Sequence, residues 1–252
     1  MTDSTTRFSN RVEDYIKYRP SYPPEILEVL KTQCGLGVDS KVADIGSGTG
    51  ILTELLLATG CTVYAVEPNE PMRLAGERQC VQYPGFTSIA GTAEQTTLAS
   101  NSIDLITAGQ AFHWFAPVET HKEFTRTLKP GGSVAILWNK RRKDSTPYLR
   151  DYEQLLIRYG TDYTKVQHDN IVFDDMEKFF HPAVVHFTSF PYTQRFGFDG
   201  VRGRLLSSSY IPDSGEPGYD EMLRELEIIF DRHSVNGLVD IEYDTELYYG
   251  KW

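Results

Sequence analysis

Short apolar segments alternate with amphipathic ones between residues 41 and 138. The apolar segments are rich in valine, isoleucine and aromatic residues and predict strands over Lys41–Ile45, Cys61–Val66, Phe86–Ala90, Ile103–Thr107 and Ser133–Trp138. The segments between them have helical spacing, and two of the three open on proline: Ile51–Thr59, Pro71–Gln79 and Pro117–Leu128. Repeated alternation of strand and helix is typical of a doubly wound parallel sheet, which binds ligands at the carboxyl ends of its strands.

The last 110 residues have a different pattern. Helices are predicted over Asp144–Tyr159, Phe173–Phe180, Gly200–Ser208 and Asp220–His233, and strands over Ala183–Arg195 and Leu238–Tyr249. We therefore expect an α/β fold, with a doubly wound, seven-stranded, mostly parallel sheet whose last strand is antiparallel. The helices inserted among the final strands would form a lid over the strand ends.

Composition narrows the class of protein. The 252 residues carry a net charge of −10, which disfavours a nucleic-acid partner, and no apolar run is long enough to span a membrane. The three cysteines form no C-x-x-C pair, so neither a disulfide framework nor a zinc site is expected. The polar N-terminus lacks the apolar core of a secretory signal. These features favour an acidic cytoplasmic protein; nothing in the sequence indicates its oligomeric state.

A glycine-rich loop follows the first predicted strand. Asp44, Gly46, Ser47, Gly48 and Gly50 come just before a predicted helix, and glycines there let a ligand approach the backbone closely. Glu67 ends the second predicted strand, about twenty residues later, where a carboxylate can accept hydrogen bonds from both hydroxyls of a ribose.

The loop spacing separates two possible cofactors. A dinucleotide requires G-x-G-x-x-G, but this loop reads G-x-G-x-G and has Ile51 at the last dinucleotide position. Asp44 would repel a pyrophosphate, whereas it suits a ligand with an ammonium group. The pattern therefore favours S-adenosylmethionine over NAD.

These motifs together resemble the class I (Rossmann-like) S-adenosylmethionine-dependent methyltransferases. Asp44 and the glycines are similar to the family's first motif, and Glu67 to its ribose-binding acid. Gly91–Glu94 resembles its adenine-side motif, and Leu128–Gly132 the turn before its fifth strand. One position departs from the pattern: many relatives have an aspartate where this chain has Thr92, whose hydroxyl is a weaker acceptor.

A narrower resemblance concerns a small-molecule branch that includes trans-aconitate methyltransferase-like proteins. It depends on Gln110–Phe115 and on an N-terminal segment with Phe8, Tyr15, Tyr18, Arg19 and Tyr22. The resemblance implies one domain in three parts: residues 1–40 fold over the cofactor, residues 41–139 form the core that binds it, and residues 140–252 supply lid helices and the final strands.

The candidate site follows from the resemblance. The expected cofactor-binding residues are Tyr18, Arg19, Asp44, Gly46, Ser47, Gly48, Glu67, Pro68, Met72, Thr92, Ala93, Glu94 and Gln110. Tyr22, His113 and Trp114 are expected on the substrate side, and His113 is the candidate general base because its intrinsic pKa suits neutral pH. No metal ligand cluster is visible.

Basic residues leave an alternative open. The run Lys140–Lys143 and the pair Arg202 and Arg204 are either solvated or form a rim that attracts an acidic substrate. The favoured function is methyl transfer to a carboxylate or hydroxyl of a small molecule. The alternatives are C-methylation of a quinone-like or lipid-like acceptor and a non-catalytic, S-adenosylmethionine-binding regulatory module.

Overall fold

A seven-stranded sheet forms the centre of the molecule in the computed structural model, which describes residues 12–161, 163 and 173–252. Its strand order is β3-β2-β1-β4-β5-β7-β6; β7 runs antiparallel to both of its neighbours, and the other pairs are parallel. The strands are β1 Lys41–Ile45, β2 Thr62–Val66, β3 Phe86–Ile89, β4 Ile103–Gly109, β5 Leu128–Arg141, β6 His186–Phe196 and β7 Val239–Lys251. The predicted doubly wound α/β fold is confirmed.

Helices cover both faces of this sheet. One face packs against α2 (Glu25–Cys34), α3 (Ile51–Leu57) and α4 (Glu70–Cys80), and the other against α5 (Pro117–Thr127) and α7 (Phe173–Phe180). Local chemistry sets where two of these helices begin: Asn69 accepts the Met72 amide at the start of α4, and proline occupies the first turn of α5. The sheet therefore has two separate apolar cores.

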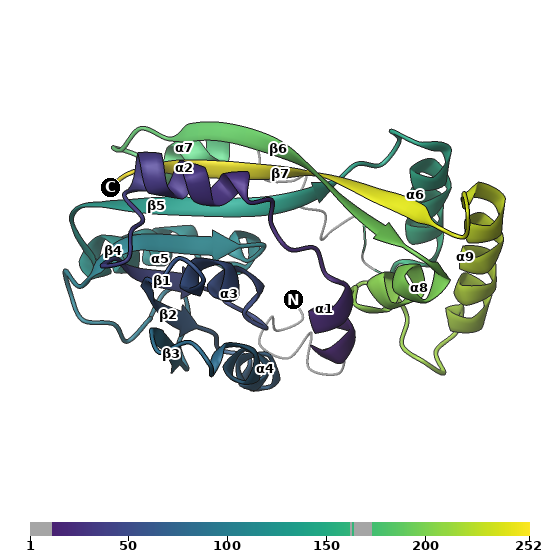
Figure 1. Cartoon of the computed structure of the whole chain (residues 1–252), viewed down its shortest axis with the longest axis horizontal. Helices are drawn as coiled ribbons and strands as arrows, with labels where there is room; N and C mark the ends of the chain where they lie inside the picture. The colour runs from purple at the N-terminus through teal and green to yellow at the C-terminus, as the bar shows by residue number, and fades with distance from the viewer. Residues whose placement is uncertain (1–11, 162, 164–172) are drawn as a thin grey trace.

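The three long strands β5, β6 and β7 continue beyond this part of the molecule into a second lobe (Figure 1). That lobe contains α6 (Pro147–Tyr159), α8 (Phe198–Leu206) and α9 (Tyr219–His233), and its own apolar core includes Leu155, Leu205, Leu226 and Tyr243. The short helix α1 (Val12–Tyr18) lies between the sheet and this lobe, against α8 (Figure 1).

The structure differs from the sequence-based expectations at three places: the start of β5 and the packing of α2 and of α7. Leu128–Gly132 is not a turn before the fifth strand: Leu128 already pairs with Ile103, and the register then shifts, so the glycines lie in an irregularity within β5. Helix α2 packs on the sheet, because Ile26 and Leu30 are fully buried there. Helix α7 likewise packs against α5, outside the expected lid. Residues 1–11 of the predicted N-terminal cover lie outside the described residues.

Candidate functional site

The glycine loop at the end of β1 has the conformation that its sequence predicts. Gly46 has a φ of +68°, and a Cβ atom at this position would lie 2.5 Å from the Cβ of Ala111. The Gly46 amide donates to the carbonyl of Val66 at the end of β2, with an N–O distance of 2.8 Å. This hydrogen bond holds the loop against the carboxyl end of β2, the neighbouring parallel strand.

Glu67 is fixed beside this loop by backbone donors. Its Oε2 accepts from the Gly48 amide at 2.9 Å and its Oε1 from the Asn69 amide at 2.8 Å. Each oxygen keeps a second lone pair for another donor. Burial raises the pKa of Glu67, while the two amide bonds act in the opposite direction.

Asp44 lies deeper, at the end of β1, and is 1% exposed. Its two oxygens accept from the hydroxyls of Thr53 (2.6 Å) and Thr107 (2.9 Å). Burial raises the pKa of Asp44 to about 6, although the two threonine hydroxyls oppose the shift. A cation that reaches this carboxylate would favour its ionised form.

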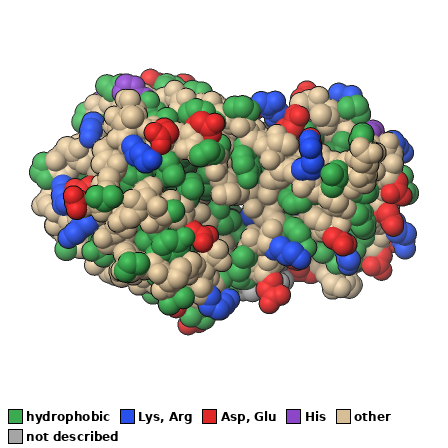
Figure 2. Space-filling view, viewed as in Figure 1, with side chains coloured by type: hydrophobic (Ala, Val, Ile, Leu, Met, Phe, Trp, Pro, Cys, Tyr) green, Lys and Arg blue, Asp and Glu red, His purple; other side chains and the backbone are tan. Residues whose placement is uncertain are grey.

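The surface is hollowed between the sheet and the second lobe (Figure 2), and two adjoining chambers lie at the carboxyl ends of the strands. We name the chamber that contains Glu67, Met72 and Thr92 the Glu67 chamber. The other, which contains Asp44, Tyr22 and five basic residues, is the arginine chamber. Both are lined by Tyr15, Arg19, Gly46, Gly48, Gly109, Gln110 and Tyr210.

The structure brings most of the predicted site residues to these chambers. The Glu67 chamber is lined by Arg19, Gly46, Gly48, Glu67, Pro68, Met72, Thr92, Ala93, Glu94, Gln110, His113 and Trp114. Asp44, Ser47 and Tyr22 line the arginine chamber. His113 and Trp114, expected on the substrate side, thus lie in the same chamber as the expected cofactor-binding residues.

Tyr18 is the predicted residue that lines neither chamber. Its ring packs on α8 at Gly203 and contacts Phe196 edge-on, with ring centroids 6.5 Å apart. Tyr15 lines both chambers instead, together with Arg19. These two residues are four positions apart and therefore share one side of the helical turn that the Arg19 amide closes on the Tyr15 carbonyl.

Gln110 lies at the junction of the two chambers in a rare backbone conformation. Its φ is +60°, which is uncommon for a residue with a side chain and costs conformational strain. Its amide donates to the Leu137 carbonyl at 2.9 Å, so the end of β4 is fixed against β5.

The adenine-side motif already makes internal contacts. The hydroxyl of Thr92 accepts from the Gln95 amide at 3.2 Å, and Glu94 accepts from the Ala116 amide at 2.8 Å, just before α5. Glu94 therefore ties this loop to α5 whether or not it also meets a ligand.

The basic run Lys140–Lys143 begins within the last two residues of β5 and separates into inward and outward side chains. Arg141 lines the arginine chamber, where it pairs with Glu153 and donates to the Tyr163 hydroxyl at 3.0 Å. Arg142 instead forms a two-bond pair with Asp244 outside that chamber. Of the other two arginines, Arg204 is buried in the chamber wall, whereas Arg202 is exposed.

Several lining residues were not expected from the sequence. Asn69 could have been found, because asparagine before Glu-Pro is a helix-start signal next to a predicted site. Asn139 directly follows the predicted strand Ser133–Trp138, at the edge of the sheet where ligands are expected. Tyr163 and Tyr210 had no such signal, because they come from connecting segments that reach the chamber only through the packing of the second lobe.

The charged groups present suit an adenosyl amino acid better than a dinucleotide. Among the described residues that line the Glu67 chamber, Glu67 and Glu94 are acidic, and Arg19 is the one lysine or arginine. A pyrophosphate would meet two carboxylates there, whereas a ribose, an adenine and an ammonium group would meet acceptors. Residues 12–161, 163 and 173–252 contain no group of three or more metal-ligating side chains placed to hold a metal ion. Within the same residues, every helix is too short or too polar to span a membrane.

The fold and this site together define a class of protein. Its members have a Rossmann-like sheet in which two carboxylates, here Asp44 and Glu67, lie on either side of the glycine loop that follows β1. Residues 43–136 match the methyltransferase-domain family. Over this region the chain is similar to the methyltransferase domains of the class I (Rossmann-like) S-adenosylmethionine-dependent methyltransferases, and it shares their fold.

Curated relatives agree with this assignment. An uncharacterised methyltransferase of Mycobacterium tuberculosis is 35% identical over 158 residues, which are 63% of this chain and 62% of the relative. An uncharacterised methyltransferase of Schizosaccharomyces pombe is 35% identical over 59% of this chain and 58% of its own length. The matched region thus spans about three fifths of each relative.

Solved structures share the fold. A candidate type II methyltransferase from Anaeromyxobacter dehalogenans superposes with a TM-score of 0.70 over 93% of this chain and 98% of that chain, at 21% identity. A candidate antibiotic-pathway methyltransferase from Anabaena variabilis has a TM-score of 0.63 over 90% of this chain and 97% of that chain, at 20% identity.

Proposed function

We propose that the chain transfers a methyl group from S-adenosylmethionine to an oxygen of a small molecule, either a carboxylate or a hydroxyl. One observation carries this proposal: two buried carboxylates, Asp44 and Glu67, end adjacent parallel strands on either side of a glycine loop. Glu67 matches the hydroxyls of a ribose, and Asp44 matches the ammonium group of the methionyl tail. The three cysteines are buried thiols, which agrees with a proposed location in the cytoplasm.

The two chambers suggest how the ligands divide. We infer that the adenosine occupies the Glu67 chamber and that the acceptor enters the arginine chamber, so that the reacting atoms meet near Gly109 and Gln110, which line both. When bound, the cofactor supplies an electrophilic methyl group. This chain's residues hold the two reactants in line, exclude water and match their charges.

The acceptor atom affects the need for a base. The described residues that line the arginine chamber include no histidine, and burial raises the pKa of Tyr22 well above its ordinary value. A carboxylate is already ionised at neutral pH and needs no base. His113 remains the proposed base for a hydroxyl acceptor, although it lines the Glu67 chamber. The basic lining also makes the charged acceptor better supported than the quinone-like or lipid-like alternative.

Cofactor binding is tested first with Glu67→Ala. Loss of the charge-assisted bonds to the ribose should weaken S-adenosylhomocysteine binding by about 1–3 kcal/mol, measured by isothermal titration calorimetry. Glu70→Ala is the matched control, because the Glu70 side chain is 73% exposed on the first turn of α4. Unchanged affinity in Glu67→Ala, or heat from NAD in place of S-adenosylhomocysteine, would contradict the proposal.

Turnover is tested separately with radiolabelled S-adenosylmethionine and a panel of carboxylic acids and alcohols. Label in a small-molecule product supports the enzyme. Cofactor binding with no acceptor methylated across the panel would favour the regulatory-module alternative.

A further inference from the structure

Two arginines of the arginine chamber bind neutral partners. Arg19, which follows α1, donates from Nη2 to the Ser207 carbonyl at 2.8 Å. Arg204, on α8, donates to the hydroxyls of Tyr243 at 3.1 Å and Ser208 at 3.3 Å. Within the part of the chain that the structure describes, neither guanidinium forms an ion pair with a carboxylate.

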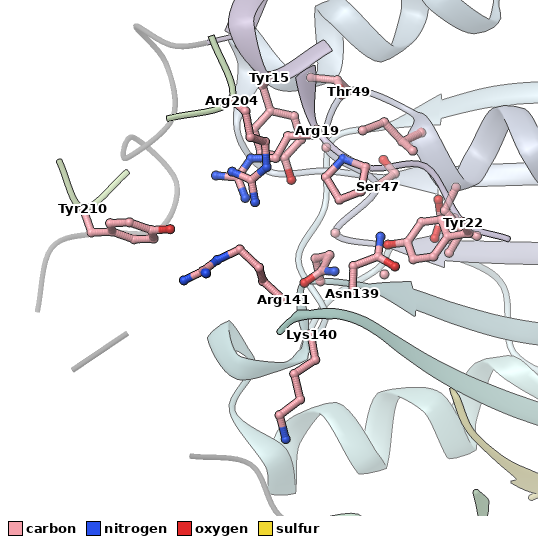
Figure 3. Close-up of a pocket in the computed structure, with 18 of the residues that line it drawn as sticks. Tyr15, Arg19, Tyr22, Ser47, Thr49, Asn139, Lys140, Arg141, Arg204 and Tyr210 are labelled. Atoms are coloured by element: carbon pink, nitrogen blue, oxygen red, sulfur yellow. The ribbon is translucent and has the colours of Figure 1, made fainter. Parts of the chain in front are cut away.

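The two guanidinium groups are close together and shielded from solvent. Figure 3 shows them side by side on one wall of the chamber, with Arg141 opposite. Arg204 is 7% exposed, and the Nε of Arg19 is buried with no hydrogen-bond partner among the described residues. Burial, and after it the charge of Arg204, lower the pKa of Arg19. Two buried like charges are unfavourable unless an anion joins them.

The other cations of the chamber already have acidic partners. Arg141 pairs with Glu153. Lys143 lies 3.9 Å from the same carboxylate, and Lys140 lies 3.6 Å from Glu246. Among the described lining residues, Asp44 is the one acid, and threonine hydroxyls hold both of its oxygens. The unbalanced positive charge is therefore concentrated at Arg19 and Arg204.

The position of Arg204 favours the acceptor as the ligand that supplies the anion. Arg19 lines both chambers, whereas Arg204 lines only the arginine chamber, where the acceptor is proposed to bind. Asp44, the proposed partner of the cofactor's ammonium group, lines the arginine chamber too, so the cofactor's carboxylate is the competing anion, and the test below separates the two. A planar guanidinium pair suits an oxyanion, because each group can donate two parallel hydrogen bonds.

We propose that Arg19 and Arg204 form an oxyanion site for the acceptor, which is then a small acid carrying a charged group away from the atom that is methylated. The inference rests on the proposed function. It makes Arg204 a residue that determines specificity, and it explains what the second lobe contributes, since α8 presents the charge that selects the acceptor. The same oxyanion would join α8 to the end of α1.

The test is calorimetric titration of the full chain, with saturating S-adenosylhomocysteine, by succinate, citrate, glycerol 3-phosphate and the uncharged dimethyl succinate. We expect at least one acid to bind and the diester not to bind; comparison of the carboxylates with the phosphate identifies the oxyanion. Arg204→Gln should weaken acid binding tenfold or more, Arg204→Lys should weaken it less, and the affinity for S-adenosylhomocysteine should change less than twofold.

Arg224→Gln is the matched control, because Arg224 is 67% exposed on α9 of the same lobe and pairs with Glu221. If Arg204→Gln fails to fold, the proposal is tested by the acid affinity of Arg204→Lys and by the comparison of succinate with dimethyl succinate in the wild type. The proposal is overturned if no acid binds, if Arg204→Gln leaves acid affinity unchanged, or if it weakens S-adenosylhomocysteine tenfold, since the anion would then be the cofactor's own carboxylate. Acid binding is also measured without S-adenosylhomocysteine, so a failure of the proposed cofactor site is recognised separately.

Discussion

Two carboxylates at the ends of neighbouring strands have different environments. Glu67 accepts hydrogen bonds from backbone amides, whose direction is fixed by the chain. Asp44 accepts from the hydroxyls of Thr53 and Thr107 and is less exposed to solvent. Desolvation therefore acts more strongly on Asp44, whose pKa rises to about 6. This makes Asp44 the residue through which pH acts on the proposed cofactor site near neutrality.

The affinity for S-adenosylhomocysteine should rise as pH increases from 5 to 7 and then level off. Only ionised Asp44 matches the ligand's ammonium group, and the ionised fraction grows through its pKa of about 6. Calorimetric titration at pH 5, 6, 7 and 8 measures the effect.

Asp44→Asn is the control for this pH dependence, because it removes the titrating carboxyl group. Glu67 titrates in the same direction, since burial raises its pKa as well, so a shallower slope can remain in the variant. Burial keeps Tyr22 and Cys80 protonated over this range. A wild-type affinity that falls from pH 5 to 7 would contradict the assignment of Asp44 to a cation.

At the scale of elements, Glu123 connects α5 to the segment between β3 and β4. It accepts from the amide and hydroxyl of Thr96 and from two nitrogens of Arg126. The hydrogen bond from Arg126 contributes most to lowering the pKa of Glu123 to about 2. The carboxylate thus holds the adenine-side loop against the helix that follows the site.

Glu123→Gln should lower the free energy of unfolding by about 1–3 kcal/mol at pH 7, because the buried bonds lose their charge. Since the folded-state pKa is depressed, the stabilisation is fully present above the ordinary glutamate value and disappears as pH falls through about 2. Urea denaturation at pH 7 and at pH 3 should therefore show a smaller difference between variant and wild type at the lower pH. Glu119→Gln, on the exposed side of the first turn of α5, should stay within about 0.5 kcal/mol.

At the scale of the whole molecule, the length of β5, β6 and β7 decides where the second lobe lies. These strands pair beyond the end of β4 and carry α6, α8 and α9 to the side of the strand ends (Figure 1). Arg141 and Arg204 line the arginine chamber there. Helix α1 contacts this lobe through the Tyr18 ring, which lies on Gly203 of α8. The site is thus built between two lobes and a helix from the N-terminal segment.

Gly203→Ala should loosen α1 while leaving global stability nearly unchanged. The new Cβ would clash with the Tyr18 ring, so the ring must leave α8, whereas alanine itself favours the helix by about 0.5–1 kcal/mol. We expect faster amide hydrogen exchange in Val12–Tyr18 and weaker S-adenosylhomocysteine binding, because Tyr15 of this helix lines the Glu67 chamber. Gly197→Ala is the control, since its Cβ would meet only the Gly237 carbonyl, at 3.7 Å. Identical exchange in both variants would show that this contact does not hold α1.

The sequence by itself determined the elements of the sheet and the acids at its strand ends. Lys41–Ile45, Phe173–Phe180 and the glycine loop were found because their signals are local: spacing of apolar residues, turn residues and backbone conformations that glycine permits. Glu67 was found for the same reason, since its place at a strand end fixes its place at the edge of the sheet.

Only the tertiary structure decided which polar side chains meet in the arginine chamber. Arg141 and Arg142 are neighbours in sequence, yet Arg141, the last residue of β5, lines the chamber, whereas Arg142, just past the strand, binds Asp244 of β7. Arg204 joins Arg19 across 185 positions of the chain, a proximity that depends on how the second lobe packs on α1. Periodicity along the chain shows which side of an element is buried, but it does not show which other element that side packs against. The proposed acceptor side of the site depends on such packing between elements, so the sequence alone could not predict it.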